Sequence, residues 1–151
     1  MGHLTFTIKM TPPTATAQQK GVFVRNGRAH FYKKAKVRDA ENFLAAMIAP
    51  HAPPRPLTGP IGLYVRWCFP YRKGERRAVV KTGLEIAHQT RPDLDNLEKS
   101  LIDTLTRLQF WTDDAQVYTK MTQKVWGPEG YLKIDISAYS EGFTFKGGVK
   151  E

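Results

Sequence analysis

The sequence contains little cysteine and no long apolar run, and both absences narrow the class of protein. Cys68 is the only cysteine among 151 residues, which excludes an internal disulfide framework and a multi-cysteine metal site. A single unpaired thiol fits a reducing compartment. No apolar stretch is long enough to span a bilayer, and residues 1–10 carry no signal-peptide core. We therefore expect a soluble cytoplasmic protein with no membrane partner.

Motifs that define several common enzyme classes are also missing. The sequence has no glycine-rich P-loop, no dinucleotide-binding turn and no Ser/His/Asp set, so we expect no nucleotide cofactor. The four histidines show no paired metal-ligand spacing, which disfavours zinc. We interpret them as surface or loop residues, with His88 a weak exception because it precedes Asp93 by only five positions.

Acidic residues are outnumbered, with 23 Lys and Arg against 14 Asp and Glu and a net charge of +9. Residues 20–38 contain seven basic and no acidic side chains, and residues 66–91 carry a net +5, whereas residues 93–114 reverse to −4. A basic run alone is often a solvated face. Carboxylates within a basic protein that must approach phosphates usually need a metal ion between them. A polyanionic partner is favoured, although acidic small substrates or a membrane surface also fit the charge.

Composition and periodicity predict a single domain of the α/β class, of the α+β type. A hydrophobic fraction of 41% is ordinary for a globular protein of this length. We expect a mixed sheet of four to six strands packed with two main helices, followed by a polar tail over 138–151. Period-two patterns predict strands, and period-3.6 patterns predict helices. The expected strands are 4–10, 61–69 (central in the sheet), 115–126 and 131–137, and the expected helices are 34–49 and 94–109.

Two basic segments have weaker structural signals. Asn26-Gly27 between two extended runs predicts a hairpin over 22–32, with a mobile basic loop as the alternative. Residues 71–91 indicate a loop or long hairpin with a short strand near 84–86. Aromatic and basic residues alternate in 23–32 and 64–71, where the rings can stack on nucleobases. Because aromatics in strands usually pack, we favour a core or dimer contact for them.

The helix predicted over 94–109 separates an apolar face from an acidic one. Its leucines fall within an arc of about 80°: Leu94, Leu97, Leu101, Leu105 and Leu108. Asp95 and Lys99 point the other way, and Asp93 lies at the helix entrance. A structural explanation suffices for the helix alone: Asp93 as N-cap, Asp95 capping with Glu98, or an Asp95–Lys99 ion pair.

A second acidic pair, Asp113-Asp114, follows that helix. It shifts the balance from a structural explanation of the acidic residues toward a functional one. If the next strand returns past the helix entrance, or if a dimer brings the acidic clusters together, the carboxylates converge. Three or four such oxygen ligands suit Mg²⁺ or Mn²⁺. A carboxylate-held metal in basic surroundings indicates phosphodiester hydrolysis, with Lys99 as an added positive charge at the phosphate.

Two sequence elements then carry a family resemblance. Residues 91–105 read RPDLDNLEKSLIDTL and residues 109–117 read QFWTDDAQV. The D-L-D-N-L-x-K element followed at this distance by D-D-A-Q-V resembles the RusA family of Holliday-junction resolvases. These are small, dimeric, Mg²⁺-dependent endonucleases of bacteria and prophages. The strongest match covers 91–117, and the predicted strand order extends the implied RusA-like domain over 1–137.

The resemblance implies a role for each matching residue. Asp93, Asp95 and Asp114 match the catalytic carboxylates that hold the metal, and Lys99 matches the lysine needed for cleavage. Asn96, Asp103 and Asp113 match motif positions with supporting roles. Residues 20–34 and 70–90 depart from the family pattern, and we expect DNA-contacting loops there. The expected DNA contacts are Arg25, Arg28, Lys33, Lys34, Arg72, Lys73, Arg76, Arg77 and Arg91.

The resemblance implies a homodimer that binds a four-way DNA junction and nicks two opposed strands by Mg²⁺-dependent hydrolysis, with Mn²⁺ as a possible substitute. Such an enzyme serves DNA recombination and repair in the cytoplasm of a bacterium or a phage-infected cell. Two alternatives stay open at this point. One is a nuclease for other branched phage DNA such as flaps and forks, and the other is a non-catalytic junction-binding protein.

Overall fold

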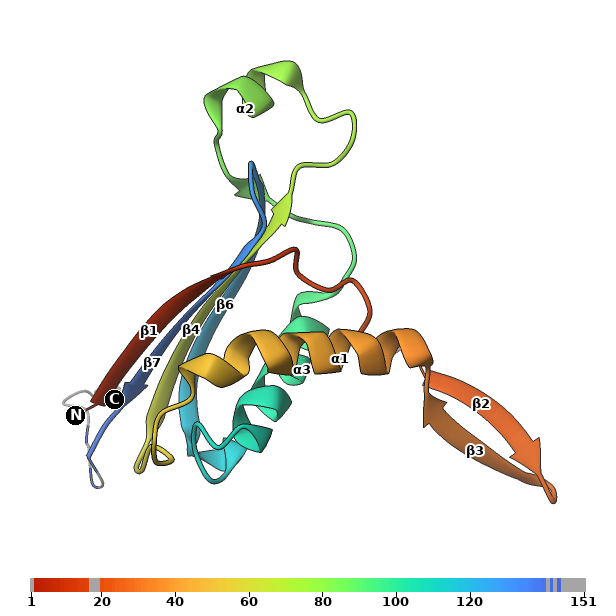
Figure 1. Cartoon of the computed structure of the whole chain (residues 1–151), viewed down its shortest axis with the longest axis vertical. Coiled ribbons are helices and arrows are strands. Elements are labelled where there is room, and N and C mark those ends of the chain that lie inside the picture. Colours follow the sequence, from red (N-terminus) through yellow and green to blue (C-terminus); the bar gives the residue numbers. More distant parts are fainter. Residues whose placement is uncertain (1, 17–19, 141, 143, 145–151) are drawn as a thin grey trace, which may run out of the picture.

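The computed structural model describes residues 2–16, 20–140, 142 and 144, and its largest element is a five-stranded mixed sheet (Figure 1). The strand β4 (Ile61–Pro70) lies at the centre of this sheet, as predicted, and pairs antiparallel with β7 (Tyr131–Ala138) and parallel with β6 (Val117–Gly127). The sheet order is β1 (Gly2–Lys9), β7 (Tyr131–Ala138), β4 (Ile61–Pro70), β6 (Val117–Gly127) and β5 (Ile86–Ala87).

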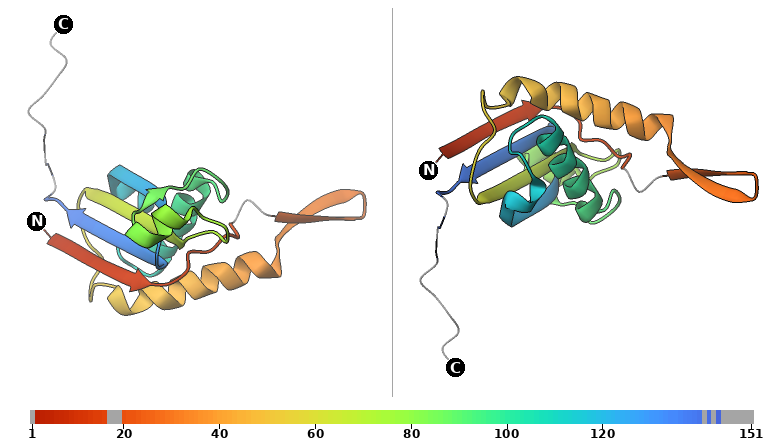
Figure 2. Two further views of the ribbon diagram at one scale, coloured as in Figure 1. Left: turned by 90° about the horizontal axis from the view of Figure 1, so that it is seen from above. Right: turned by 90° about the horizontal axis from the view of Figure 1, so that it is seen from below.

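Two helices pack on one face of the sheet and enclose the core (Figure 2). The parallel β4–β6 pair needs a crossover connection, and α3 (Leu94–Arg107) lies within it. α1 (Ala35–Ile48) packs beside α3, followed by the short helix η1 (Ala49–His51). Leu97, Leu101 and Leu105 are fully buried, which confirms the predicted apolar face of α3. The first and last leucines of the predicted stripe, Leu94 and Leu108, are partly buried.

The mixed α/β architecture is confirmed, with shifts at several boundaries. The two predicted helices end at Ile48 and Arg107, and the first strand spans Gly2–Lys9. The strand predicted from 115 begins at Val117, because the short helix η2 (Asp114–Gln116) takes its first residues. The loop or hairpin predicted over 71–91 is wrong in part, since it contains α2 (Arg77–Thr82) as well as β5.

A separate two-stranded sheet projects from the body of the protein (Figure 1). It consists of β2 (Lys20–Arg25) and β3 (Arg28–Lys33), which confirms the predicted hairpin. Asn26 and Gly27 at its turn have positive φ angles of 52° and 71°, the combination that a type I′ hairpin turn requires. Lys33 Nζ forms an ion pair of 2.9 Å with Glu41 of α1 and so ties the hairpin base to the body.

Two further sequence predictions concern membranes and the C-terminal tail. Within the described residues, no helix combines the length and apolarity needed to cross a membrane. β7 continues to Ala138, and the predicted tail beyond it lies mostly outside the described residues.

Candidate active site

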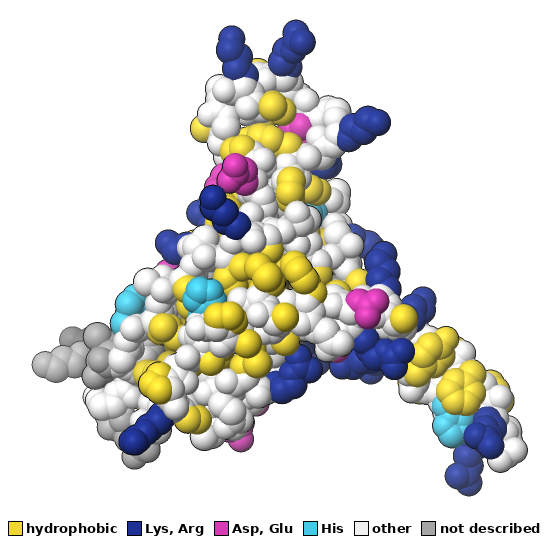
Figure 3. Space-filling view, viewed as in Figure 1, with side chains coloured by type: hydrophobic (Ala, Val, Ile, Leu, Met, Phe, Trp, Pro, Cys, Tyr) yellow, Lys and Arg dark blue, Asp and Glu magenta, His cyan; other side chains and the backbone are white. Residues whose placement is uncertain are grey.

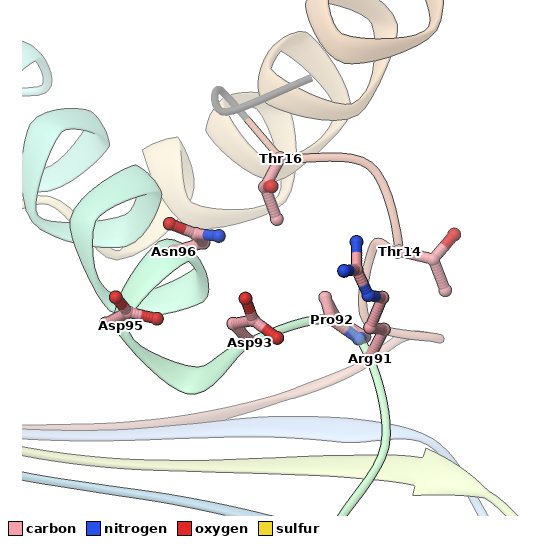
Figure 4. Close-up of a pocket in the computed structure, with 7 residues that line it drawn as sticks. All are labelled: Thr14, Thr16, Arg91, Pro92, Asp93, Asp95 and Asn96. Carbon is pink, nitrogen blue, oxygen red and sulfur yellow. The ribbon is translucent and has the colours of Figure 1, made fainter.

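The start of α3 forms one wall of a cavity of about 400 Å³ (Figure 4). Asp93, Asp95 and Asn96 line it from the helix start. Thr14 and Thr16 line it from the segment that follows β1, and Arg91 lies across the cavity from Asp95. Two carboxylates, one amide and one guanidinium therefore face one space.

A second cavity of about 340 Å³ adjoins the helix and is lined by one carboxylate from each acidic pair, but not by Asp93 or Asp113. Asp95 and Asp114 line it together, so the returning chain does pass the helix start. Asp95 lines both cavities. The other lining residues are Asn96, Glu98, Lys99, Ile102, Asp103 and Lys120. Within the described residues, no three Asp, Glu, His or Cys side chains are close enough to form a finished metal centre.

The backbone at Asp93 accounts for where its carboxylate lies. Asp93 has the extended N-cap conformation, with φ −67° and ψ 140°, but within the described part of the chain its side chain makes no capping hydrogen bond. Asp95 lies in the first turn, where the helix dipole favours negative charge. The ion pair of Lys99 is with Asp103 at 3.7 Å, one turn further on, and not with Asp95 as the structural alternative proposed.

Asp113 has a capping role that orients the second motif. Its carboxylate accepts a hydrogen bond of 2.8 Å from the Ala115 N–H, and the Gln116 side chain accepts one from the Asp113 N–H. The Gln116 amide in turn donates to the carbonyls of Leu57 and Gly59 at 3.1 and 3.0 Å. This network anchors η2, whose first residue is Asp114, and leaves the Asp114 side chain exposed beside Asp95.

Sequence reasoning missed a row of polar side chains on β6. Lys120, Thr122 and Lys124 alternate along the strand and are in register with the core-facing residues of β4. Lys120 forms an ion pair with Glu98, and Thr122 donates to the same carboxylate at 2.6 Å. Burial opposes ionisation of Glu98, but these two hydrogen bonds outweigh it and lower the pKa of Glu98. The period-two spacing of Lys120, Thr122 and Lys124 was the available signal.

Lys124 holds the segment that leads into Asp93. Its Nζ donates to the carbonyl of Pro92 at 2.7 Å and also to the carbonyl of Thr90. Burial lowers the pKa of Lys124, and the nearby charge of Asp93 acts in the opposite direction. The ammonium group therefore fixes the backbone immediately before the first acidic motif.

His88 lies in the loop that follows β5, but it is buried, so the surface part of the surface or loop interpretation does not apply to it. Its ring is 4% exposed, stacks on Trp126 with centroids 3.9 Å apart and meets Phe69 edge-on. Burial, followed by the charge of Lys124, lowers the pKa of His88 to about 4. Nδ1 accepts a hydrogen bond of 3.3 Å from the Thr90 N–H, so a neutral His88 helps to hold the approach to the site.

The predicted DNA-contacting residues are exposed, and all but Arg91, which lines the cavity of Asp93, belong to two projections that carry Lys and Arg side chains (Figure 3). One is the β2–β3 hairpin, with Arg25 and Arg28 beside its turn. The other is the segment around α2, where Arg72 pairs with Glu75 at 3.3 Å and its guanidinium lies 5.3 Å from the Trp126 ring centroid. In Figure 1 the start of α3 lies between these projections. The remaining predicted contacts are Lys33, Lys34, Lys73, Arg76, Arg77 and Arg91.

Comparison with known proteins identifies the family. The model for "Endodeoxyribonuclease RusA" matches residues 11–137, which is most of the chain. The chain belongs to the RusA family of endodeoxyribonucleases. This confirms the resemblance seen in the two acidic motifs, and both motifs lie inside the matched range.

Two individual relatives match this RusA-family chain over most of its length, and a third matches a shorter segment. It is 29% identical over 135 residues to the crossover junction endodeoxyribonuclease rusA of Lactococcus phage r1t, covering 87% of this chain and 95% of the relative. It is 28% identical over 133 residues to the uncharacterized protein YqaN of Bacillus subtilis (85% and 92%). The crossover junction endodeoxyribonuclease RusA of Escherichia coli K12 is 45% identical over 38 residues (25% and 32%).

Proposed function

We propose that this RusA-family nuclease is structure-selective and cleaves four-way DNA junctions, as the printed name of its phage relative describes for that protein. The observation that carries the proposal is the shared cavity of Asp95 and Asp114 at the start of α3, between two basic projections. Both carboxylates are exposed and line one cavity, although the chain has a net charge of +9. A phosphodiester backbone drawn in by the projections brings its phosphates to these carboxylates.

The carboxylates fit Mg²⁺ or Mn²⁺ by the chemistry of their donor atoms. Asp93, Asp95 and Asp114 would hold the ion, since hard oxygen ligands are those that both metals prefer. When bound, the metal supplies a more acidic water and neutralises charge that develops on the scissile phosphate. The three aspartates are exposed, so their side chains can turn toward a shared ion. Lys99 lies in the same cavity and adds a positive charge for the phosphate.

The biological setting is part of the same proposal. A homodimer suits a four-way junction, because two-fold symmetry offers two equivalent strands to two equivalent sites. Paired nicks then resolve the junction during recombination and repair of DNA in the cytoplasm of a bacterial or phage-infected cell. Sedimentation equilibrium of the free protein and of its junction complex measures the dimer directly.

The decisive experiment compares wild type with Asp93→Asn, Asp95→Asn and Asp114→Asn on a labelled mobile four-way junction, with and without Mg²⁺. We expect symmetric paired nicks from the wild type in Mg²⁺ and no cleavage from the variants. The variants should still bind the junction, since each removes a negative charge near the phosphates. Asp135→Asn is the matched control, because Asp135 lies on β7 and pairs with His3 and Lys133, away from the cavities.

Three results would contradict the proposal. Efficient cutting of flaps or forks with poor cutting of four-way junctions would identify a nuclease for other branched DNA. Tight junction binding without cleavage in any divalent metal would identify a non-catalytic binding protein. Equal loss of binding and cleavage in the three variants would assign the aspartates to folding.

A further inference from the structure

The β2–β3 hairpin exposes aromatic rings that the body of the protein does not cover. Phe23 and Tyr32 are each 49% exposed and Phe31 is 73% exposed. Of the core or dimer contact predicted for the rings of 23–32, the core contact is therefore wrong and the dimer contact stays a prediction, whereas Trp67 and Phe69 in 64–71 are core residues. Rings of this size are usually buried in strands, so the hairpin has a surface suited to a partner.

The two faces of the hairpin differ in chemistry. Residues opposite each other in an antiparallel pair lie on the same face. One face carries Tyr32 opposite Gly21, Phe23 opposite His30 and Arg25 opposite Arg28. Its rings form a continuous column, since Phe23 stacks on His30 with centroids 5.1 Å apart and meets Tyr32 at 6.0 Å. We call this the ring face, and two arginines end it at the hairpin turn.

Gly21 permits the first ring of this column to lie flat on the strand. A Cβ atom at Gly21 would fall 2.2 Å from the Tyr32 ring, which no packed structure tolerates. Gly21 is buried beneath that ring although it lies in an otherwise exposed hairpin. The glycine therefore keeps Tyr32 beside Phe23.

The opposite face is the natural comparison. It carries Val22 opposite Phe31 and Val24 opposite Ala29, with Lys20 and Lys33 at the hairpin base. Its large apolar side chains are more exposed than the Phe and Tyr rings of the ring face, but it has a single aromatic residue and no charge near the turn.

Charge and position indicate which partner the ring face takes. Residues 20–33 contain four basic side chains and no acidic one, which matches a polyanion. Three residues of sequence separate the hairpin from Thr16, which lines the cavity of Asp93 and Asp95. A six-residue strand is about 20 Å long, so the arm begins beside the nuclease site and reaches along DNA bound there.

We propose that the ring face stacks on nucleobases that become unpaired at the branch point of the DNA, with Arg25 and Arg28 on the flanking phosphates. Aromatic rings interleaved with arginine form a base-stacking surface in proteins that bind single strands. Base-paired duplex keeps its bases inside the stack and offers the ring face no equivalent surface. The hairpin thereby selects branched over continuous DNA. This inference rests on the proposed nuclease function and names how its substrate is recognised.

The test measures binding in EDTA, where cleavage is absent, to a four-way junction and to a fully paired duplex of equal length. We expect Phe23→Ala to weaken junction binding about tenfold, the loss of one stacked base, and to leave duplex binding unchanged. Phe31→Ala is the matched control on the opposite face and should change neither. Phe23→Tyr should retain junction affinity, and Gly21→Ala should reproduce the defect by displacing Tyr32.

A photochemical measurement locates the contact independently. 5-Bromodeoxyuridine placed at the branch should crosslink to a ring-face residue, and the same base within the duplex should not. The proposal is overturned if Phe23→Ala and Phe31→Ala bind both DNAs like wild type. It is also overturned if either variant converts a dimer to a monomer in sedimentation, because the arm then contacts a second copy. Failure of wild type to cut junctions in Mg²⁺ would instead remove the nuclease function, since these binding ratios do not depend on cleavage.

Discussion

Lys99 shows how a surface residue acquires two competing explanations. Its ammonium group is 3.7 Å from Asp103, an exposed ion pair of the kind that contributes little to stability. It also lines the cavity of Asp95 and Asp114. The helical spacing visible in the sequence favoured an Asp95–Lys99 pair, and only the geometry shows that the partner is one turn later. The position of Lys99 beside the carboxylates supports the proposal that it contacts a substrate phosphate.

We expect Lys99→Ala to lower the cleavage rate by about 100-fold, because a positive charge aimed at the reacting phosphate is lost. Junction affinity and the free energy of unfolding should stay near the wild-type values, since the side chain is exposed. Single-turnover cleavage with saturating enzyme measures the rate. Asp103→Asn is the control, because it breaks the same ion pair and keeps the ammonium group. An equal loss of cleavage rate in both variants would assign Lys99 a structural role in the helix.

The second residue-scale prediction concerns acid. Burial lowers the pKa of His88 from its ordinary value to about 4. Between pH 6.5 and pH 4, the imidazole is therefore protonated in the unfolded chain and neutral in the folded protein. The neutral imidazole therefore contributes fully to the free energy of unfolding above pH 6.5. As the pH drops toward 4, this contribution is lost, by up to about 3 kcal/mol. Urea unfolding at pH 7, 5.5 and 4.5 measures this loss.

His88→Phe provides the control for this acid sensitivity. It keeps an aromatic ring against Trp126 and Phe69 but has no group that titrates in this range. The carboxylates, including Glu98 with its lowered pKa, contribute equally in both proteins. A wild type that loses no more stability in acid than His88→Phe would contradict a buried neutral imidazole.

At the scale of elements, β6 links the strand pattern to the site. Lys124 ties the carbonyls of Thr90 and Pro92, directly before Asp93, to β6. Strand prediction found β6 but assigned no role to its lysines. Their function depends on the register with β4 and on the path of the 88–93 segment, neither of which is local to the sequence. Alternation of side chains along the sequence predicts which residues share a face of the strand. It does not predict which segment covers that face.

Lys124→Met tests this positioning role. Methionine keeps much of the apolar stem but cannot donate to the two carbonyls, so the backbone before Asp93 is released. We expect cleavage to fall by about tenfold or more and the Mg²⁺ concentration for half-maximal rate to rise, with junction affinity retained. Lys124→Arg should restore part of the rate, and Lys133→Met on β7 should have no effect. A normal Mg²⁺ requirement in Lys124→Met would assign Lys124 to stability alone.

For the whole molecule, the periodic elements were predictable and the projections were only partly so. The buried face of α3 was predictable from the spacing of Leu97, Leu101 and Leu105, and the hairpin turn was predictable from Asn26-Gly27. Both signals are local in the sequence. α2 has no such signal, since its six residues give less than two turns of pattern. The exposure of Phe23 and Tyr32 is also not local, because it depends on the hairpin extending beyond α1. The meeting of Asp95 and Asp114 in one cavity was likewise not predictable from local signals, because it depends on the crossover connection returning past the start of α3.

The separation of charge in the whole molecule makes a prediction about salt. If the basic projections contact phosphates, junction affinity falls steeply with salt, at a slope of about −0.9 per phosphate neutralised on a double logarithmic plot. Arg76 and Arg77 lie at the start of α2 and are exposed. Replacing both with alanine should flatten the slope by about two, whereas the Lys9→Ala, Lys133→Ala control on the sheet should keep it. Fluorescence anisotropy with a labelled junction between 50 and 300 mM salt, about the range where such contacts are released, measures both slopes. An unchanged slope in the arginine variant would mean that the α2 projection does not touch DNA, and the hairpin and Arg91 would then carry the electrostatic contact.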